Sequence, residues 1–120
     1  MVFDHLVLVV SDQKKSKEFY LRALLPLGIS FVRDDAECSG FGTFGKPSFW
    51  ICEEIDIQKP MHIAFIAENR KSVDEFYEAA IAAGGKNNGA PGIRDHYGPN
   101  YYSAYVIDPD GHNIEAVCRN

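Results

Sequence analysis

The chain has 120 residues, 46% of them hydrophobic, and carries a formal net charge of −5 with a pI near 5.3. This length suits one domain, or two small halves that share a core. The acidic charge argues against a nucleic-acid or anionic-membrane partner, and no apolar run in the sequence approaches the ~20 residues that a membrane-spanning helix needs.

The cysteines give an expectation about redox state and location. Cys38, Cys52 and Cys118 are odd in number, widely spaced and without a Cys-x-x-Cys pair. This pattern is typical of reduced thiols, and not of a disulfide framework or a zinc ribbon. Strand-like sequence at the start of the chain, in place of a basic and apolar signal segment, agrees with this interpretation. We therefore expect a cytoplasmic protein with free thiols.

The first half of the sequence predicts one strand, one helix and three further strands. Residues 2–10 are rich in β-branched residues and end at Ser11, which favours a strand. Ser11 or Asp12 is expected to cap a helix that ends at Pro26 and Gly28. The three shorter strands are predicted at residues 29–33, 37–44 and 48–53.

The second half repeats this order at a constant spacing. His62 lies 57 positions after His5, and Glu75-Phe-Tyr lies 57 positions after Glu18-Phe-Tyr. A shared offset across a strand and a helix points to internal duplication. The sequence therefore predicts an α+β fold of two βαβββ modules that form a curved mixed sheet around a central site. The modules are expected at residues 1–58 and 61–120.

The closing hairpin holds the most informative residue. Asp108-Pro-Asp-Gly is strong turn chemistry, and the strand after it alternates between two faces. Glu115 is a carboxylate in the middle of this otherwise apolar strand. A buried carboxylate without a partner costs several kcal/mol or more, so Glu115 is expected to have a cationic or metal partner.

His5 and His62 are the candidate partners of Glu115, because equivalent positions of two paired modules meet near their pseudo-twofold axis. Two neutral imidazoles and one carboxylate form a facial triad suited to iron(II), manganese(II), nickel(II), cobalt(II) or zinc(II). The alternative is a hydrogen-bonded cluster in which Glu115 pairs with a protonated histidine or with Arg119. We interpret His5, His62 and Glu115 as ligands of one divalent metal ion.

These residues resemble the vicinal oxygen chelate superfamily, which includes glyoxalase I, extradiol dioxygenases, fosfomycin-resistance thiol transferases and bleomycin-resistance proteins. The resemblance rests on His5-Leu-Val-Leu-Val, on the Glu18-Phe-Tyr helix and on Asp108-Pro-Asp-Gly-His-Asn-Ile-Glu115. It implies paired modules around a metal site, commonly in a homodimer. It also implies metal ligands at His5, His62 and Glu115, and chelation of a substrate through adjacent oxygens.

Two regions complete the expected site. Glyoxalase I-like members have a fourth ligand on the last strand of the first module, where this chain has Trp50 and Cys52. Trp cannot ligate a metal and Cys52 is interpreted as a packed thiol, so Trp50 is expected to wall a substrate pocket. In the long loop predicted at 87–101, Arg94 is expected to hold a substrate carboxylate, and His96 or Tyr101 to transfer protons. Tyr97 and Tyr102 are further expected substrate contacts; the alternative is a packed tyrosine flap with a solvated His96.

The resulting functional hypothesis is a metal-dependent enzyme that performs lyase, isomerase or transferase chemistry on a small substrate with vicinal oxygens. Glu115, His96 and Tyr101 are its expected catalytic residues. Two alternatives remain: an extradiol-type iron(II) dioxygenase, and a metal-free small-molecule binding protein similar to bleomycin-resistance proteins. His112, in the turn before Glu115, is expected to be solvent-facing or structural.

Overall fold

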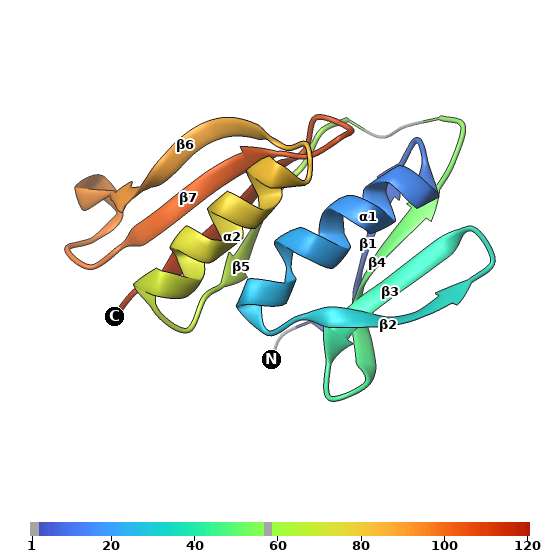
Figure 1. The fold of residues 1–120 in the computed structure, drawn as a ribbon, viewed down its shortest axis with the longest axis horizontal. Helices are drawn as coiled ribbons and strands as arrows, with labels where there is room; N and C mark the ends of the chain where they lie inside the picture. Colours follow the sequence, from blue (N-terminus) through green and yellow to red (C-terminus); the bar gives the residue numbers. More distant parts are fainter. Residues whose placement is uncertain (1–2, 57–58) are drawn as a thin grey trace.

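The computed structural model describes residues 3–56 and 59–120 and shows the predicted element order twice (Figure 1). The first module consists of β1 (Leu6–Val10), α1 (Gln13–Ala23), the 3-10 helix η1 (Leu25–Leu27), β2 (Ser30–Asp35), β3 (Cys38–Thr43) and β4 (Lys46–Glu53). The second consists of β5 (His62–Ile66), α2 (Arg70–Ala82), β6 (Lys86–Ile93), the 3-10 helix η2 (Asp95–Tyr97), β7 (Tyr102–Ile107) and β8 (Asn113–Cys118). The α+β fold of two βαβββ modules is confirmed.

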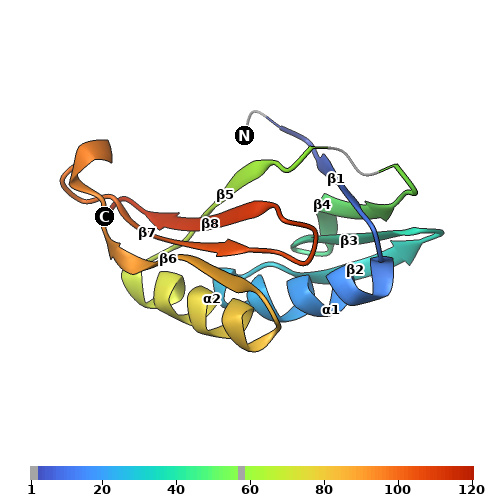
Figure 2. The same ribbon diagram turned by 90° about the horizontal axis from the view of Figure 1, so that it is seen from above.

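Each module forms a four-stranded mixed sheet of its own. The strand orders are β1-β4-β3-β2 and β5-β8-β7-β6, and the pairs β1/β4 and β5/β8 are parallel. Both helices lie on the same side of the two sheets (Figure 2). Each sheet therefore has one face covered by its helix and one open face. No helix among the described residues is long and apolar enough to span a membrane.

The two helices begin in the same way and bury equivalent residues. Asp12 caps α1 by accepting a hydrogen bond from the Lys15 amide, and Asn69 caps α2 in the same manner. Such caps satisfy amides that the first turn of a helix leaves without partners. Phe19 and Phe76, which are 57 positions apart, are both buried in one apolar core that the two modules share.

Polar contacts from the β7–β8 turn join the second module to the first. The Tyr20 hydroxyl of α1 donates to Asp108, and both side chains are buried. The His112 ring, which has no exposed surface, accepts a hydrogen bond from the Met61 amide at Nδ1. Its Nε2 lies 3.2 Å from the Val9 carbonyl oxygen of β1. Of the two expectations for His112, the structural one is therefore confirmed.

The largest differences from the predicted boundaries are in β1 and β6. Strand β1 begins at Leu6, so His5 lies just before it, and residue 2 of the predicted strand lies outside the described residues. The prediction of a loop at 87–101 was wrong for its first half, because residues 87–93 belong to β6. The register of β6 shifts twice, around Gly89 and Gly92. Because its pairing is irregular and its sequence is rich in glycine and asparagine, β6 lacks the alternation of apolar and polar residues by which a strand is predicted.

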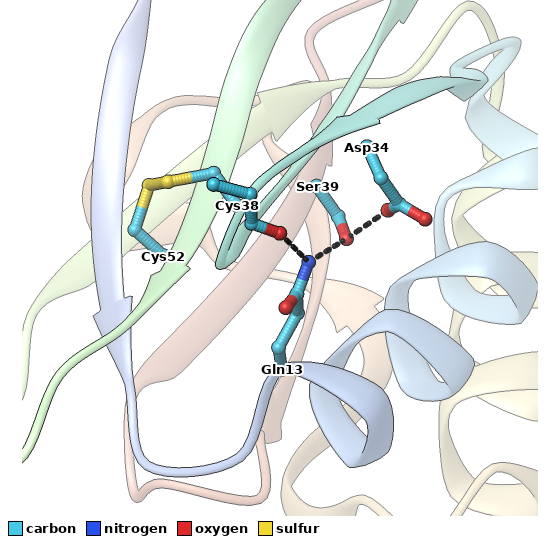
Figure 3. Close-up of a disulfide and its surroundings, with 6 residues drawn as sticks. Gln13, Asp34, Cys38, Ser39 and Cys52 are labelled. Carbon is cyan, nitrogen blue, oxygen red and sulfur yellow. Dashed lines mark hydrogen bonds between the residues drawn. A yellow bond between two sulfur atoms is a disulfide. The ribbon is translucent and has the colours of Figure 1, made fainter.

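The expectation of three free thiols was wrong for two of them. Cys38 and Cys52 form a disulfide (Figure 3), whereas Cys118 is free and buried. The two residues lie directly opposite each other in the β3–β4 pairing, with their Cα atoms 4.1 Å apart. The hairpin register creates this proximity, which the spacing along the sequence does not reveal. The argument from the cysteines for a cytoplasmic location is thereby removed.

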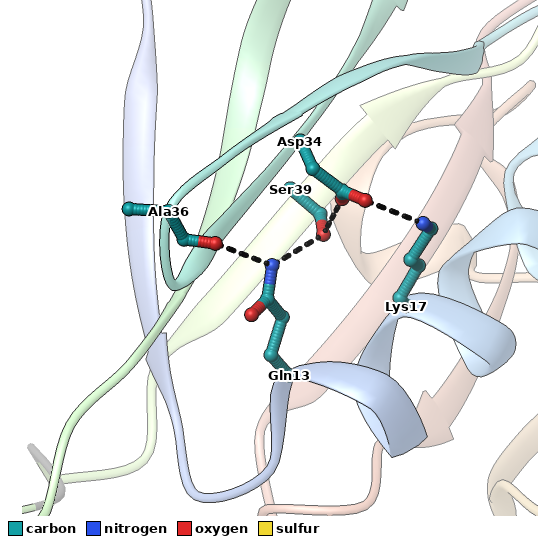
Figure 4. A network of polar contacts seen from close by, with 5 residues as sticks. All are labelled: Gln13, Lys17, Asp34, Ala36 and Ser39. Carbon is teal, nitrogen blue, oxygen red and sulfur yellow. Dashed lines mark hydrogen bonds and ion pairs between the residues drawn. The ribbon is translucent and has the colours of Figure 1, made fainter.

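A polar network next to the disulfide fixes the β2–β3 hairpin to α1 (Figures 3 and 4). The side-chain nitrogen Nε2 of Gln13 donates to Ser39 Oγ at 3.1 Å, and Ser39 Oγ donates to the Asp34 carboxylate at 2.6 Å. Lys17 pairs with the same carboxylate at 2.9 Å. These contacts lie on the helix side of the first sheet, and they hold α1 against the strands that it covers.

Candidate metal and substrate site

Glu115 is buried on the side of β8 that faces away from the apolar core. Its neighbours in sequence, Ile114 and Ala116, pack into that core, and only 1% of Glu115 is exposed. Alternation along the strand therefore places the carboxylate on the open face of the second sheet. Its nearest residues on the adjacent strands are Ala64 of β5 and Tyr105 of β7.

Both oxygens of Glu115 have partners. His62 Nε2 lies 2.8 Å from Oε1, and the Tyr101 hydroxyl donates to Oε2. Half of the His62 side chain is exposed, so the pair connects a buried carboxylate to the surface of the open face. Hydrogen bonds to a charged acceptor offset much of the cost of burying it.

Tyr101 acts on Glu115 as a neutral donor. Burial raises the pKa of Tyr101, and the hydrogen bond to Glu115 and the charge of that carboxylate raise it further. The phenol therefore keeps its proton at neutral pH and donates it in the hydrogen bond to Glu115.

His5 is apart from this pair. Its side chain is 54% exposed, and Nδ1 lies 2.8 Å from the Asp4 carboxylate. Within residues 3–56 and 59–120, no three His, Cys, Asp or Glu side chains are grouped so that they could hold a metal ion. One chain thus brings two of the three predicted ligands together and leaves the third elsewhere.

The donor atoms of the His62–Glu115 pair fit a divalent metal. An imidazole nitrogen and a carboxylate oxygen suit the first-row metals named above, and binding would require deprotonated Nε2. Two protein ligands are fewer than catalytic metal sites commonly use. A metal site at this pair therefore needs another donor.

A groove of about 540 Å³ opens beside the pair and gathers most of the predicted loop residues. Arg94, His96 and Tyr97 line it together with His62 and Tyr105. The rings of His96 and Tyr97 are 4.1 Å apart, and Tyr97 lies 5.1 Å from the Tyr101 ring. Tyr101, which donates to Glu115, is not among the described residues that line the groove, but its ring contacts Tyr97, which is.

Two predicted substrate contacts lie elsewhere. The Tyr102 hydroxyl donates to Asp74 of α2 at 2.6 Å. Trp50 lies on β4 in the first sheet, against Gly40 and with the Arg33 guanidinium 5.3 Å from its ring centre. Neither lines the groove within a single chain.

Tyr105 is a groove residue that the sequence interpretation missed. Its ring centre is 6.0 Å from that of His62, and it is the direct cross-strand partner of Glu115. The signal was present in the sequence, because counting back from the tight turn at Asp108 places Tyr105 opposite Glu115.

Comparison with known proteins identifies the family. The model of the Glyoxalase/Bleomycin resistance protein/Dioxygenase superfamily matches residues 39–116. The chain belongs to this superfamily. The resemblance inferred from the two histidines, the helix motif and the closing hairpin is therefore confirmed. A comparison with curated protein sequences gave no match.

Solved structures of the superfamily cover the whole chain. A glyoxalase/bleomycin resistance protein from Albidiferax ferrireducens is 31% identical, covers 100% of both chains and has a TM-score of 0.85. A glyoxalase/bleomycin resistance protein/dioxygenase family enzyme from Burkholderia phytofirmans is 19% identical over 98% of each chain, with a TM-score of 0.73. The fosfomycin resistance protein FosX from Listeria monocytogenes, solved as a variant with Mn(II) and a dihydroxypropylphosphonic acid, is 23% identical. It matches over 98% of this chain and 90% of its own, with a TM-score of 0.72, and at this identity the likeness shows the fold alone.

Proposed function

We propose that this chain is a divalent-metal-dependent enzyme that acts on a small substrate bound through vicinal oxygens, by lyase, isomerase or transferase chemistry. The observation that carries the proposal is the His62–Glu115 pair. A carboxylate with 1% exposure is joined to a half-exposed imidazole beside an open groove. Burying a carboxylate is costly. The buried carboxylate of Glu115 is nevertheless paired with His62, which a ligand in the groove can reach.

The proposed metal ligands are His62 and Glu115 of one chain and His5 of the partner subunit in a homodimer. Two of these side chains meet in one chain and His5 does not, which favours completion of the site by a second copy. The open faces that carry the candidate ligands also expose apolar side chains. Val7 of β1 is 45% exposed and Ile66 of β5 is 83% exposed. Such residues favour burial against another surface.

A bound metal would act as a Lewis acid toward an oxygen anion of the substrate. The proposed role of Tyr101 is to fix the orientation of Glu115, a contact of the kind that tunes metal ligands. The proposed role of His96, exposed at the edge of the groove, is proton transfer to or from the substrate. The metal is one of iron, manganese, nickel, cobalt or zinc, and the Mn(II) in the Listeria relative agrees with this set.

A metal titration of three proteins tests the proposal. Wild-type protein is expected to bind one Mn(II) or Co(II) ion per chain, and Glu115→Ala is expected to lose this binding while the fold is kept. His96→Ala is the matched control, because it removes another histidine of the same groove that is not a proposed ligand. Full metal binding by Glu115→Ala would contradict the proposal.

A metal-free binding protein is the second candidate, and one observation favours it. The direct 2.8 Å contact between His62 and Glu115 is a complete hydrogen-bonded pair without any metal. If the wild-type protein binds none of the five metals, this candidate replaces the first. If only iron(II) binds, and catechols then cause oxygen uptake, the dioxygenase alternative is favoured.

A further inference from the structure

Arg94 gives the groove a permanent positive charge. The residues that line the groove include this arginine and two histidines, but no aspartate or glutamate, although the whole chain has a net charge of −5. The Arg94 guanidinium carbon lies 5.4 Å from the ring centre of Tyr105. This is a distance at which a cation is attracted to an aromatic face. The lining residues thus carry one permanent cation and no carboxylate, while Glu115 lies behind His62.

Hydrogen bonds fix Arg94 on one side and leave its other donors for a ligand. Nη2 donates to the Ala90 carbonyl at 2.7 Å and to the Ser103 carbonyl at 3.3 Å. A guanidinium has five N–H donors, and these two bonds use those of Nη2. The N–H groups of Nη1 and Nε remain for a ligand, and a carboxylate can accept a charge-assisted hydrogen bond from one of them.

The backbone of β6 is shaped to leave room for this arginine. A Cβ atom at Gly89 would come within 3.2 Å of Arg94 Nη2 and 2.8 Å of the Tyr105 ring. Gly89 also has a φ of +153°, which side-chain-bearing residues rarely adopt. A Cβ at Gly92 would lie 3.4 Å from Nη1. Both irregular positions of the strand thus face the same guanidinium.

We infer that the groove binds a small substrate that carries a carboxylate, and that Arg94 binds this carboxylate while the vicinal oxygens lie at His62 and Glu115. The inference rests on the proposed function and names its substrate class. Both ends lie near Tyr105, with the Arg94 guanidinium carbon 5.4 Å and the His62 ring centre 6.0 Å from its ring centre. These two distances limit how far apart the ends can be, so the substrate is short. One permanent cation balances one negative charge, which favours a carboxylate over a phosphate dianion.

Binding of two matched compounds tests the inference by calorimetry. Protocatechuate is a catechol with one carboxylate, and its amide has the same shape without the charge. Wild-type protein is expected to bind the acid about tenfold more tightly than the amide, as a charge-assisted hydrogen bond allows. Arg94→Met is expected to abolish this ratio, and Arg94→Lys to retain part of it. Arg70→Met is the control, because Arg70 also lies over a tyrosine, Tyr102, but away from the groove.

The outcomes separate the inference from the proposed function. An acid-to-amide ratio that persists in Arg94→Met, or is near one in wild-type protein, would overturn the inference, as would no measurable binding of the acid. If catechols bind the metal-loaded protein without a preference for charge, the metal proposal stands alone. If the protein binds no metal but shows an Arg94-dependent preference for the acid, the carboxylate site stands and the metal proposal fails.

Discussion

Replacing Tyr20 by phenylalanine removes one hydroxyl group from the contact between the modules. That hydroxyl donates to Oδ2 of Asp108, and both side chains are buried. The other oxygen, Oδ1, accepts hydrogen bonds from the backbone N–H groups of Asp110 and His112. Without the hydroxyl, one carboxylate oxygen of a buried residue loses its hydrogen-bond partner. Hydrogen bonds to charged groups contribute ~1.5–3 kcal/mol, so we expect a loss of about 2 kcal/mol in the free energy of unfolding.

Urea unfolding followed by circular dichroism measures this loss, and a thermal scan is expected to show a midpoint about 8 °C lower for a chain of this length. The internal repeat supplies the control. Tyr77 is equivalent to Tyr20 in the second module, and among the described residues its hydroxyl makes no hydrogen bond. Tyr77→Phe is expected to change stability little. Equal losses in the two variants would refute the reasoning.

The same contact predicts a dependence on pH. Burial raises the pKa of Tyr20, and the nearby Asp108 carboxylate raises it further. Above about pH 10 the unfolded chain releases the tyrosine proton while the folded chain keeps it, so the unfolded state binds fewer protons and stability falls as the pH rises. Wild-type protein is therefore expected to lose stability above pH 10 more steeply than Tyr20→Phe. Parallel profiles would contradict this.

Two further predictions concern the disulfide and Tyr101. Reduction of the Cys38–Cys52 bond, which closes a loop with a sequence separation of 14, is expected to lower the free energy of unfolding by about 3 kcal/mol. Urea titrations with and without a reductant check this. An unchanged unfolding midpoint would contradict the expected stabilisation by the disulfide. Tyr101→Phe is expected to weaken metal binding about tenfold by loosening Glu115. Calorimetry with Mn(II) measures the change, and wild-type affinity in the variant would show that Tyr101 does not position the ligand.

Local sequence signals were sufficient for most of the fold. Of the two cap residues predicted for the first helix, Asp12 caps α1, and the predicted turn at Asp108-Pro-Asp-Gly joins β7 to β8. Strand β6 could not be predicted in the same way, because two register shifts break its alternation and small or polar residues fill it. Its pairing with β7 is set by contacts distant in sequence, which override weak local propensity.

The site was predictable where strand alternation decides the geometry. Strand alternation places Glu115 and His62 on the same face of two paired strands, and their side chains form a hydrogen bond there. The Cys38–Cys52 bond and the position of His5 depend on how hairpins and modules meet in space, which a single sequence does not encode locally. Repeat symmetry made His5 equivalent to His62 but left open whether one chain or two complete the set.

Heterodimers of two ligand variants test whether three side chains from two copies form one metal site. His5→Ala and Glu115→Ala chains, carried on different tags, are co-expressed and the mixed dimer is purified through both. In a twofold dimer that shares its sites, one site of the heterodimer keeps all three ligands, so we expect about one metal ion per heterodimer and none in either variant homodimer. If the wild-type dimer binds metal and the heterodimer binds none, this account is contradicted.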